Sequence, residues 1–346
     1  MSFKRFDQQD IVISAESITA PVWSGDVVTL SEFYTSSTQI QGTSGQYYYN
    51  LYQTGSTLEQ ARVQLAVSYA DKKGSGSLPY NSAVPGNTPS STIYGQYRNL
   101  VLGNEDLDFT FGGETSEYFY VISIDRARYK EKLLPGTLTL DLHLSGSSAA
   151  GLTLTDDSRT RSTVTFTDSG RVYELVSGSL GVVNTSIAST GYTSNSGSYG
   201  KFLPDVGIIL LNGNALDSPT SNGGMGFGTN RSASVSGVSN FRNIFNALSY
   251  GGEYKSGFRL QSEETISSNF VFVRARNAEF NYSTNPSNIT GSGELRHSVM
   301  IDSPQSFITA VGLYNDNNDL LGVAKLSKPL LKDFTKESLL RIKLDY

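Results

Sequence analysis

Few side chains in this sequence could carry acid–base or metal chemistry. The chain has two histidines, His143 and His297, and no cysteine. Thiolate nucleophiles, disulfides and thiolate metal sites are therefore excluded. A histidine base could act only with partners that folding brings to it, and neither a nucleophile elbow nor a metalloprotease helix surrounds either histidine. We expect His143 to lie on the polar, surface side of a strand and His297 to lie in a turn.

Adjacent carboxylates occur at Asp156 and Asp157 and again at Glu263 and Glu264. Glycoside hydrolysis needs two carboxyl groups that face each other across the substrate. Neighbouring residues on a strand point to opposite faces, so neither pair is sufficient by itself. A depolymerase with two carboxylates remains the least favoured hypothesis, and we predict that the chain is not an enzyme.

Two further motifs resemble ligand loops. The glycine-rich stretch 223–228 lacks the preceding strand and the following lysine-bearing helix of a phosphate loop, so it is interpreted as a flexible assembly loop. Asp316, Asn318 and Asp319 offer oxygen ligands without the well-placed glutamate of a calcium loop, which favours a hairpin tip. We predict no catalytic, cofactor-binding or metal-binding residues and no cofactor. The Asn-x-Ser/Thr sites at Asn184, Asn230, Asn281 and Asn288 are attributed to chance.

The composition favours strands. The 346 residues include 20 Tyr, 17 Phe and 34 Gly, and only 17% are charged. Tyrosine, threonine, valine and glycine in these amounts are typical of short strands joined by tight turns. The net charge of −5 offers no general attraction to nucleic acid or to anionic membranes. Neither a leader peptide nor an apolar run of membrane-spanning length is evident, so we expect a soluble chain without membrane insertion.

Alternating apolar and polar residues place the main elements. Residues 63–69, 118–124 and 137–144 are predicted strands, the last with its leucines buried and its polar residues in water. The continuous apolar run 206–211 is predicted to be a strand buried on both faces, and 240–250 an amphipathic helix. A meander is expected over 152–183.

The last forty residues predict a hairpin and a final strand. Residues 308–314 and 320–326 are apolar and flank five consecutive asparagines and aspartates, whose side chains bond their own backbone. A last strand ending at Tyr346 is expected to close a sheet. The predicted fold is mainly β, with antiparallel sandwich or jelly-roll-like sheets, one or two short helices and long loops.

We divide the chain into an N-terminal arm or edge strands (1–45), a first β domain (46–150) and a second β domain (151–346). The boundary at 150 rests on the Ser-rich and Gly-rich stretch 145–151. A loop is predicted from Asp71 to Gly95, where Tyr80 and Tyr94 would offer contact surface for assembly. The cations Arg126, Arg128, Lys130 and Lys132 are interpreted as a solvated connector, with a docking patch for an acidic partner as the alternative.

Three segments resemble one family. LPDVGIILLNGNALD (203–217), EETISSNFVFVRARNAEFNYSTNPS (263–287) and the C-terminal segment from residue 308 resemble virion structural proteins of contractile-tailed, T-even-like phages, especially those of marine cyanobacteria, with a further similarity at SYADKKGSGSLPYNS. The resemblance implies a tail or baseplate component, made in the host cytoplasm and present in the virion in several symmetry-related copies beside other virion proteins. It carries over no catalytic residues.

The function predicted from the sequence is therefore a phage virion structural protein that assembles through its N-terminal arm and long loops. A receptor-binding or carbohydrate-binding module at the tail tip is the alternative, and it would require a shallow groove lined by several aromatic side chains. The run Tyr47 to Tyr49 is the nearest candidate, although alternate tyrosines on a strand would face the core.

Overall fold

The fold is given by a computed structural model, which describes residues 4–36, 47–144, 150–184, 198–231, 240–249 and 257–345. The predicted fold class is confirmed: the chain is mainly β, with 43% strand and 14% helix, and its sheets are antiparallel. The described residues hold four α-helices where one or two were expected. The helices are α1 (Pro89–Leu102), α2 (Gly213–Asp217), α3 (Phe241–Ser249) and α4 (Val299–Asp302). The 3₁₀ turns are Gln8–Asp10, Arg126–Arg128 and Thr220–Asn222.

The chain forms two compact units. One contains residues 18–264 and is called the sheet unit; the other contains residues 1–17 and 265–346 and is called the hairpin unit. This division differs from the predicted one, because both predicted boundaries, after residues 45 and 150, fall within the sheet unit. Residues 145–149 lie outside the described ranges, but the strands on either side of them pair with each other, with Ala150 opposite His143.

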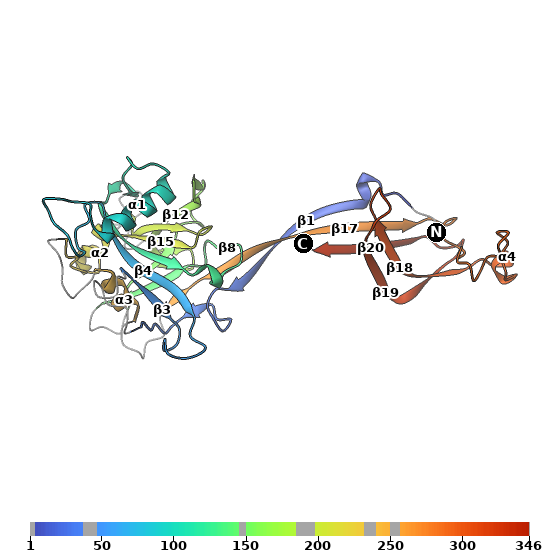
Figure 1. The fold of residues 1–346 in the computed structure, drawn as a ribbon, viewed down its shortest axis with the longest axis horizontal. Helices are drawn as coiled ribbons and strands as arrows, with labels where there is room; N and C mark the ends of the chain where they lie inside the picture. The colour runs from blue at the N-terminus through green and yellow to red at the C-terminus, as the bar shows by residue number, and fades with distance from the viewer. Residues whose placement is uncertain are drawn as a thin grey trace. The chain divides into compact units, whose positions relative to one another are not determined.

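The sheet unit is built on one twelve-stranded sheet (Figure 1). Along the sheet, the strands are β2 (Thr29–Leu30), β16 (Phe258–Arg259), β9 (Thr139–His143), β10 (Ala150–Asp156), β12 (Gly170–Ser179), β14 (Gly200–Leu203), β15 (Ile208–Asn212), β7 (Tyr118–Ile124), β4 (Val63–Asp71) and β3 (Tyr48–Tyr52). Two short strands, β11 (Thr165–Thr167) and β13 (Val182–Val183), pair with β12, and β5 (Thr110–Phe111) pairs with β6 (Glu114–Thr115).

Apolar side chains cover both faces of this sheet. One buried cluster joins strands from both ends of the sheet with helices α2 and α3, so the sheet curls around it. The second cluster lies on the opposite face under α1, where Tyr94 packs edge-on against Phe109. As predicted from its continuous apolar run, β15 is buried along its whole length. Helix α3 begins one residue later than predicted and buries the expected apolar positions, including Ile244 and Leu248.

Two local predictions in the sheet unit are wrong. The segment 71–95 is not one loop, because Pro89 occupies the first turn of α1, and α1 turns Tyr94 into the core rather than toward solvent. The polar face of β9 is not solvated as expected, because Thr139 and His143 are buried together with its leucines and only Asp141 between them is partly exposed.

The strands of the hairpin unit belong to two further small sheets. In the first, β17 (Gln261–Ala275) lies between β1 (Ile11–Pro21) and β20 (Ser338–Asp345). The first residues of β17 still belong to the sheet unit, where residues 262 and 263 pair with β8 (Lys132–Leu133). The second is the predicted C-terminal hairpin, β18 (Ser306–Tyr314) and β19 (Leu320–Lys332). The predicted final strand is also present, as β20. Figure 1 shows β17 to β20 in orange to red and β1 in blue.

Replacement of a side chain in the doubly covered sheet tests this architecture. Leu210 on β15 is completely buried, and Leu210→Ala is expected to lower the free energy of unfolding by about 3 kcal/mol, because it removes apolar contacts and leaves a cavity. The matched change Leu58→Ala, at a side chain that is about half exposed, should change it by less than about 0.5 kcal/mol. Urea unfolding of both variants makes the comparison, and equal losses would contradict the assigned core.

Candidate interaction surface

The two histidines belong to different units. His143 is buried in β9 of the sheet unit, which corrects the expectation of a surface position. His297 is exposed in the hairpin unit, and its carbonyl accepts a hydrogen bond from the backbone N–H of Met300.

The adjacent carboxylates bind the chain's own backbone and cations. Oδ2 of Asp156 accepts the N–H of Gly136 at 2.8 Å, and Asp157 accepts Nε of Arg161 at 2.9 Å. Burial raises the pKa of both carboxyl groups above the ordinary value. Glu264 lies 2.8 Å from Nζ of Lys130, and Glu263 lies 3.8 Å from Nζ of Lys132. These side chains join neighbouring segments of the fold.

The glycine-rich stretch is folded against the sheet. Backbone N–H groups of Met225 and Phe227 donate to the carbonyl of Leu216, and Met225 is buried. The ring of Phe227 meets Tyr120 edge-on with centroids 5.7 Å apart. These contacts oppose the expected flexible loop.

Residues 315–319 form the predicted hairpin tip. Oδ1 of Asn315 accepts the N–H groups of Asn317 and Asp319 at 3.0 and 2.7 Å, and Asn318 adopts a positive φ of 65°. These contacts account for the asparagine-rich and aspartate-rich sequence through the turn that it makes. Among the described residues, no group of three or more histidine or acidic side chains could hold a metal ion.

Two of the Asn-x-Ser/Thr asparagines, Asn281 and Asn288, are buried. Oδ1 of Asn281 accepts Nζ of Lys332 at 2.7 Å, and the carbonyl of Asn277 accepts the same ammonium at 3.0 Å. Lys332 is completely buried, so it holds together the segments before and after the hairpin. No pattern in the sequence indicates this buried lysine.

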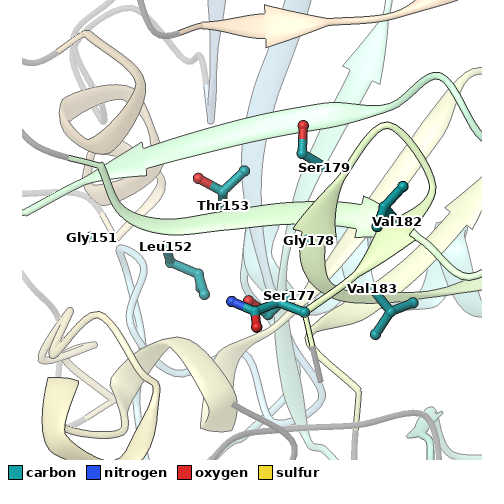
Figure 2. Close-up of a pocket in the computed structure, with 9 residues that line it drawn as sticks. Gly151, Leu152, Thr153, Ser177, Gly178, Ser179, Val182 and Val183 are labelled. Carbon is teal, nitrogen blue, oxygen red and sulfur yellow. The ribbon is translucent and has the colours of Figure 1, made fainter. Parts of the chain in front are cut away.

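A pocket of about 490 Å³ lies beside strands β10, β12 and β13 (Figure 2). Its described lining is made of glycine, aliphatic, hydroxyl and amide residues: Gly151, Leu152, Thr153, Ser177, Gly178, Ser179, Val182, Val183 and Asn184. No aromatic side chain is among them, whereas the carbohydrate-binding alternative requires several. The tyrosine run at β3 alternates as predicted, because Tyr48 is exposed while Tyr49 packs against Phe241 of α3 with centroids 4.7 Å apart.

One polar cluster in the sheet unit is centred on Arg231. Its Nε donates to the completely buried carboxylate of Asp71 at 2.8 Å, and its Nη2 donates to Glu117 at 3.0 Å. The guanidinium also lies over the ring of Tyr118, 4.4 Å from the centroid. Burial alone would lower the pKa of Arg231, but Asp71 and Glu117 raise it above its ordinary value. The cluster links the residues that follow the glycine-rich stretch to Asp71 of β4 and Tyr118 of β7.

The cations from Arg126 to Lys132 are also engaged within the chain. Arg126 donates to the carbonyls of Tyr129 and Lys130, and Arg128 donates to the hydroxyl of Ser24. Lys130 and Lys132 form the glutamate pairs described above. Through these contacts the connector joins neighbouring segments of the chain.

The hairpin unit differs from the sheet unit in how it distributes apolar side chains. Among the described residues, its buried cluster contains Val271, Leu313 and Ile342, with Val273, Val311 and Ala324 partly buried against it, whereas the two clusters of the sheet unit contain 33 and 11 buried residues. The 99 residues of the hairpin unit nevertheless carry 15 of the 26 large apolar side chains that are exposed in the described parts of the chain. Its apolar surface therefore exceeds what its own core covers.

A coherent part of this excess lies on the hairpin. We call the exposed side chains of Tyr314, Leu320, Leu321 and Val323 the hairpin surface; Leu321 is 70% exposed. They come from two paired strands, with Tyr314 directly opposite Leu320. A contiguous exposed apolar patch of this kind is typical of a protein–protein contact.

The register explains why these side chains are exposed. Val311 pairs with Ala324, and these two residues pack on the three-residue cluster formed with β17 and β20. Gly312 and Val323 form the next pair, and side chains alternate between faces along a strand, so Val323 points away from that cluster. A Cβ on Gly312 would lie 2.9 Å from the ring of Tyr314, so the glycine lets this ring lie flat against the strand.

Comparison of the chain with protein-family models, with curated proteins and with solved structures finds no match in any of the three. The described residues include no helix long and apolar enough to cross a membrane.

The Arg231 cluster provides a test of the polar contacts. Arg231→Ala should lower the free energy of unfolding by about 2–3 kcal/mol, because the buried carboxylate of Asp71 loses its cation. Lys130→Ala, which removes an exposed ion pair, should cost less than about 0.5 kcal/mol. Thermal unfolding of the two variants measures both losses. A cost for Arg231→Ala no larger than that of Lys130→Ala would contradict the stabilising role of the Arg231 cluster.

Proposed function

We propose that this chain is a structural protein of a phage virion, a tail or baseplate component that assembles with neighbouring subunits. The observation that carries the proposal is the apolar surplus of the hairpin unit. A two-stranded hairpin is at best marginally stable unless it packs against other elements. Here that packing uses three buried side chains, while Phe307, Leu321 and their neighbours remain in water. A subunit that becomes buried by assembly has this distribution.

The N-terminal strand supports the same reading. Strand β1 is predominantly exposed over its eleven residues, and Ile13 is 72% exposed. It forms the edge of the β1-β17-β20 sheet, as an arm available to a neighbouring subunit would. The sequence prediction placed the arm at residues 1–45 and assigned the other assembly contacts to long loops. The exposed apolar side chains favour the hairpin unit instead, because Tyr94 of the expected loop is buried.

The virion location rests on the sequence resemblance to structural proteins of contractile-tailed phages. The hairpin and its preceding strand β17 lie within the segments that carry this resemblance. The proposal therefore assigns the assembly role to the hairpin unit and a supporting role to the sheet unit.

The location is tested on intact particles of the virus that encodes the chain. Cryo-electron microscopy should find the chain in the tail or baseplate, with Leu321 and Val323 covered by protein. Mass spectrometry of the same purified particles serves as the control for its presence. Absence of the chain from the particles would overturn the proposal, as would a position in which the hairpin surface faces solvent.

A further inference from the structure

We propose that the hairpin surface binds a second copy of this chain, so that copies associate through their hairpin units. This inference rests on the proposed function and names the partner at the same surface. Three features favour a second copy as the partner: the exposed apolar side chains, the distribution of charge and the protection of the strand edges.

The hairpin surface supplies the apolar centre of a contact. Its four side chains are between 37% and 70% exposed. A standard interface buries about 800 Å² on each partner, counting polar atoms at its rim. The polar side chains around the hairpin surface therefore have to complete the contact.

The charge of the hairpin unit favours a copy of itself. The unit carries 11 basic and 11 acidic side chains, so the whole net charge of −5 belongs to the sheet unit. Two hairpin units therefore approach without net repulsion, whereas two sheet units repel each other. Copies are consequently expected to meet through their hairpin units.

Both signs of charge also border the hairpin surface. The tip has the exposed acids Asp316 and Asp319, whereas Lys325 on β19, two residues from Val323, is an exposed cation. A second copy thus offers an acidic tip to Lys325 of the first, and the first offers the same in return. Such reciprocal complementarity is the requirement for a contact between identical chains.

The strand edges direct this contact to the face of the hairpin. Within the described residues β18 and β19 pair only with each other, which leaves their outer edges available. The edge of β19 is interrupted where Leu326 to Pro329 bulge out between the pairs Ala310 with Lys325 and Ile308 with Leu330. Lysine and proline at such an edge oppose the addition of another strand. Association by packing of side chains is therefore favoured over extension of the sheet.

The test uses the full chain and a matched pair of double variants. Val323→Ser with Leu321→Lys alters the hairpin surface, and Phe166→Ser with Val182→Lys alters similarly exposed side chains of the sheet unit. Light scattering after size-exclusion chromatography should give the wild type and the control a mass at least twice 37.5 kDa. The hairpin double variant should elute as a monomer, with a dissociation constant raised at least about 100-fold.

Circular dichroism separates lost association from lost folding. The single variant Leu321→Lys provides a second measure, because most of this side chain already lies in water and its replacement leaves the fold intact. A monomeric wild type would overturn the proposal, as would a hairpin variant that associates as strongly as the control. A chain that is monomeric in solution but present in particles would point to a different virion protein at this surface. Absence from the particles would overturn the proposed function whatever the mass in solution.

Discussion

The contact among Val271, Leu313 and Ile342 is the physical constraint on which the account of the hairpin unit depends. These three side chains form its buried apolar cluster and join β17 and β20 to the hairpin. The strands are long and well paired, so hydrogen bonds define the unit locally. Backbone pairing does not remove apolar side chains from water, however, and the unit leaves more of them exposed than it buries. Association with another chain is the direct physical remedy.

The sheet unit follows the opposite principle. Its long antiparallel sheet is covered on both faces, by α1 on one side and by α2 and α3 on the other. Two of its buried carboxylates are bound within the chain, Asp71 by Arg231 and Asp157 by Arg161. It also carries the whole net negative charge of the chain. In the proposed function the sheet unit is the folded body and the hairpin unit is the association element.

Local sequence patterns predicted the strands and the C-terminal hairpin because alternation and turn chemistry act between near neighbours. Helix α1 was missed because Ser90, Ser91 and Gly95 weaken the helical signal that Pro89 begins. The grouping of residues 1–17 with 265–346 was missed because it depends on pairing between the two ends of the chain. The burial of His143 and Lys332 was missed because it depends on strands that pair or pack far along the chain. The sequence predicted the hairpin itself. Which of its apolar side chains stay exposed could be seen only from the register and the neighbours of each strand.

Hydrogen–deuterium exchange of the full chain at two concentrations, one below and one above association, tests the central claim most directly. We predict that amides of β18, β19 and β20 exchange more slowly at the higher concentration, because association stabilises the hairpin unit. Amides of β4, β7 and β15 should exchange at the same rate in both samples and serve as the internal control. Exchange in the hairpin unit that is independent of concentration and as slow as that of β15 would contradict the account, because it would show that the three-residue cluster is sufficient without a partner.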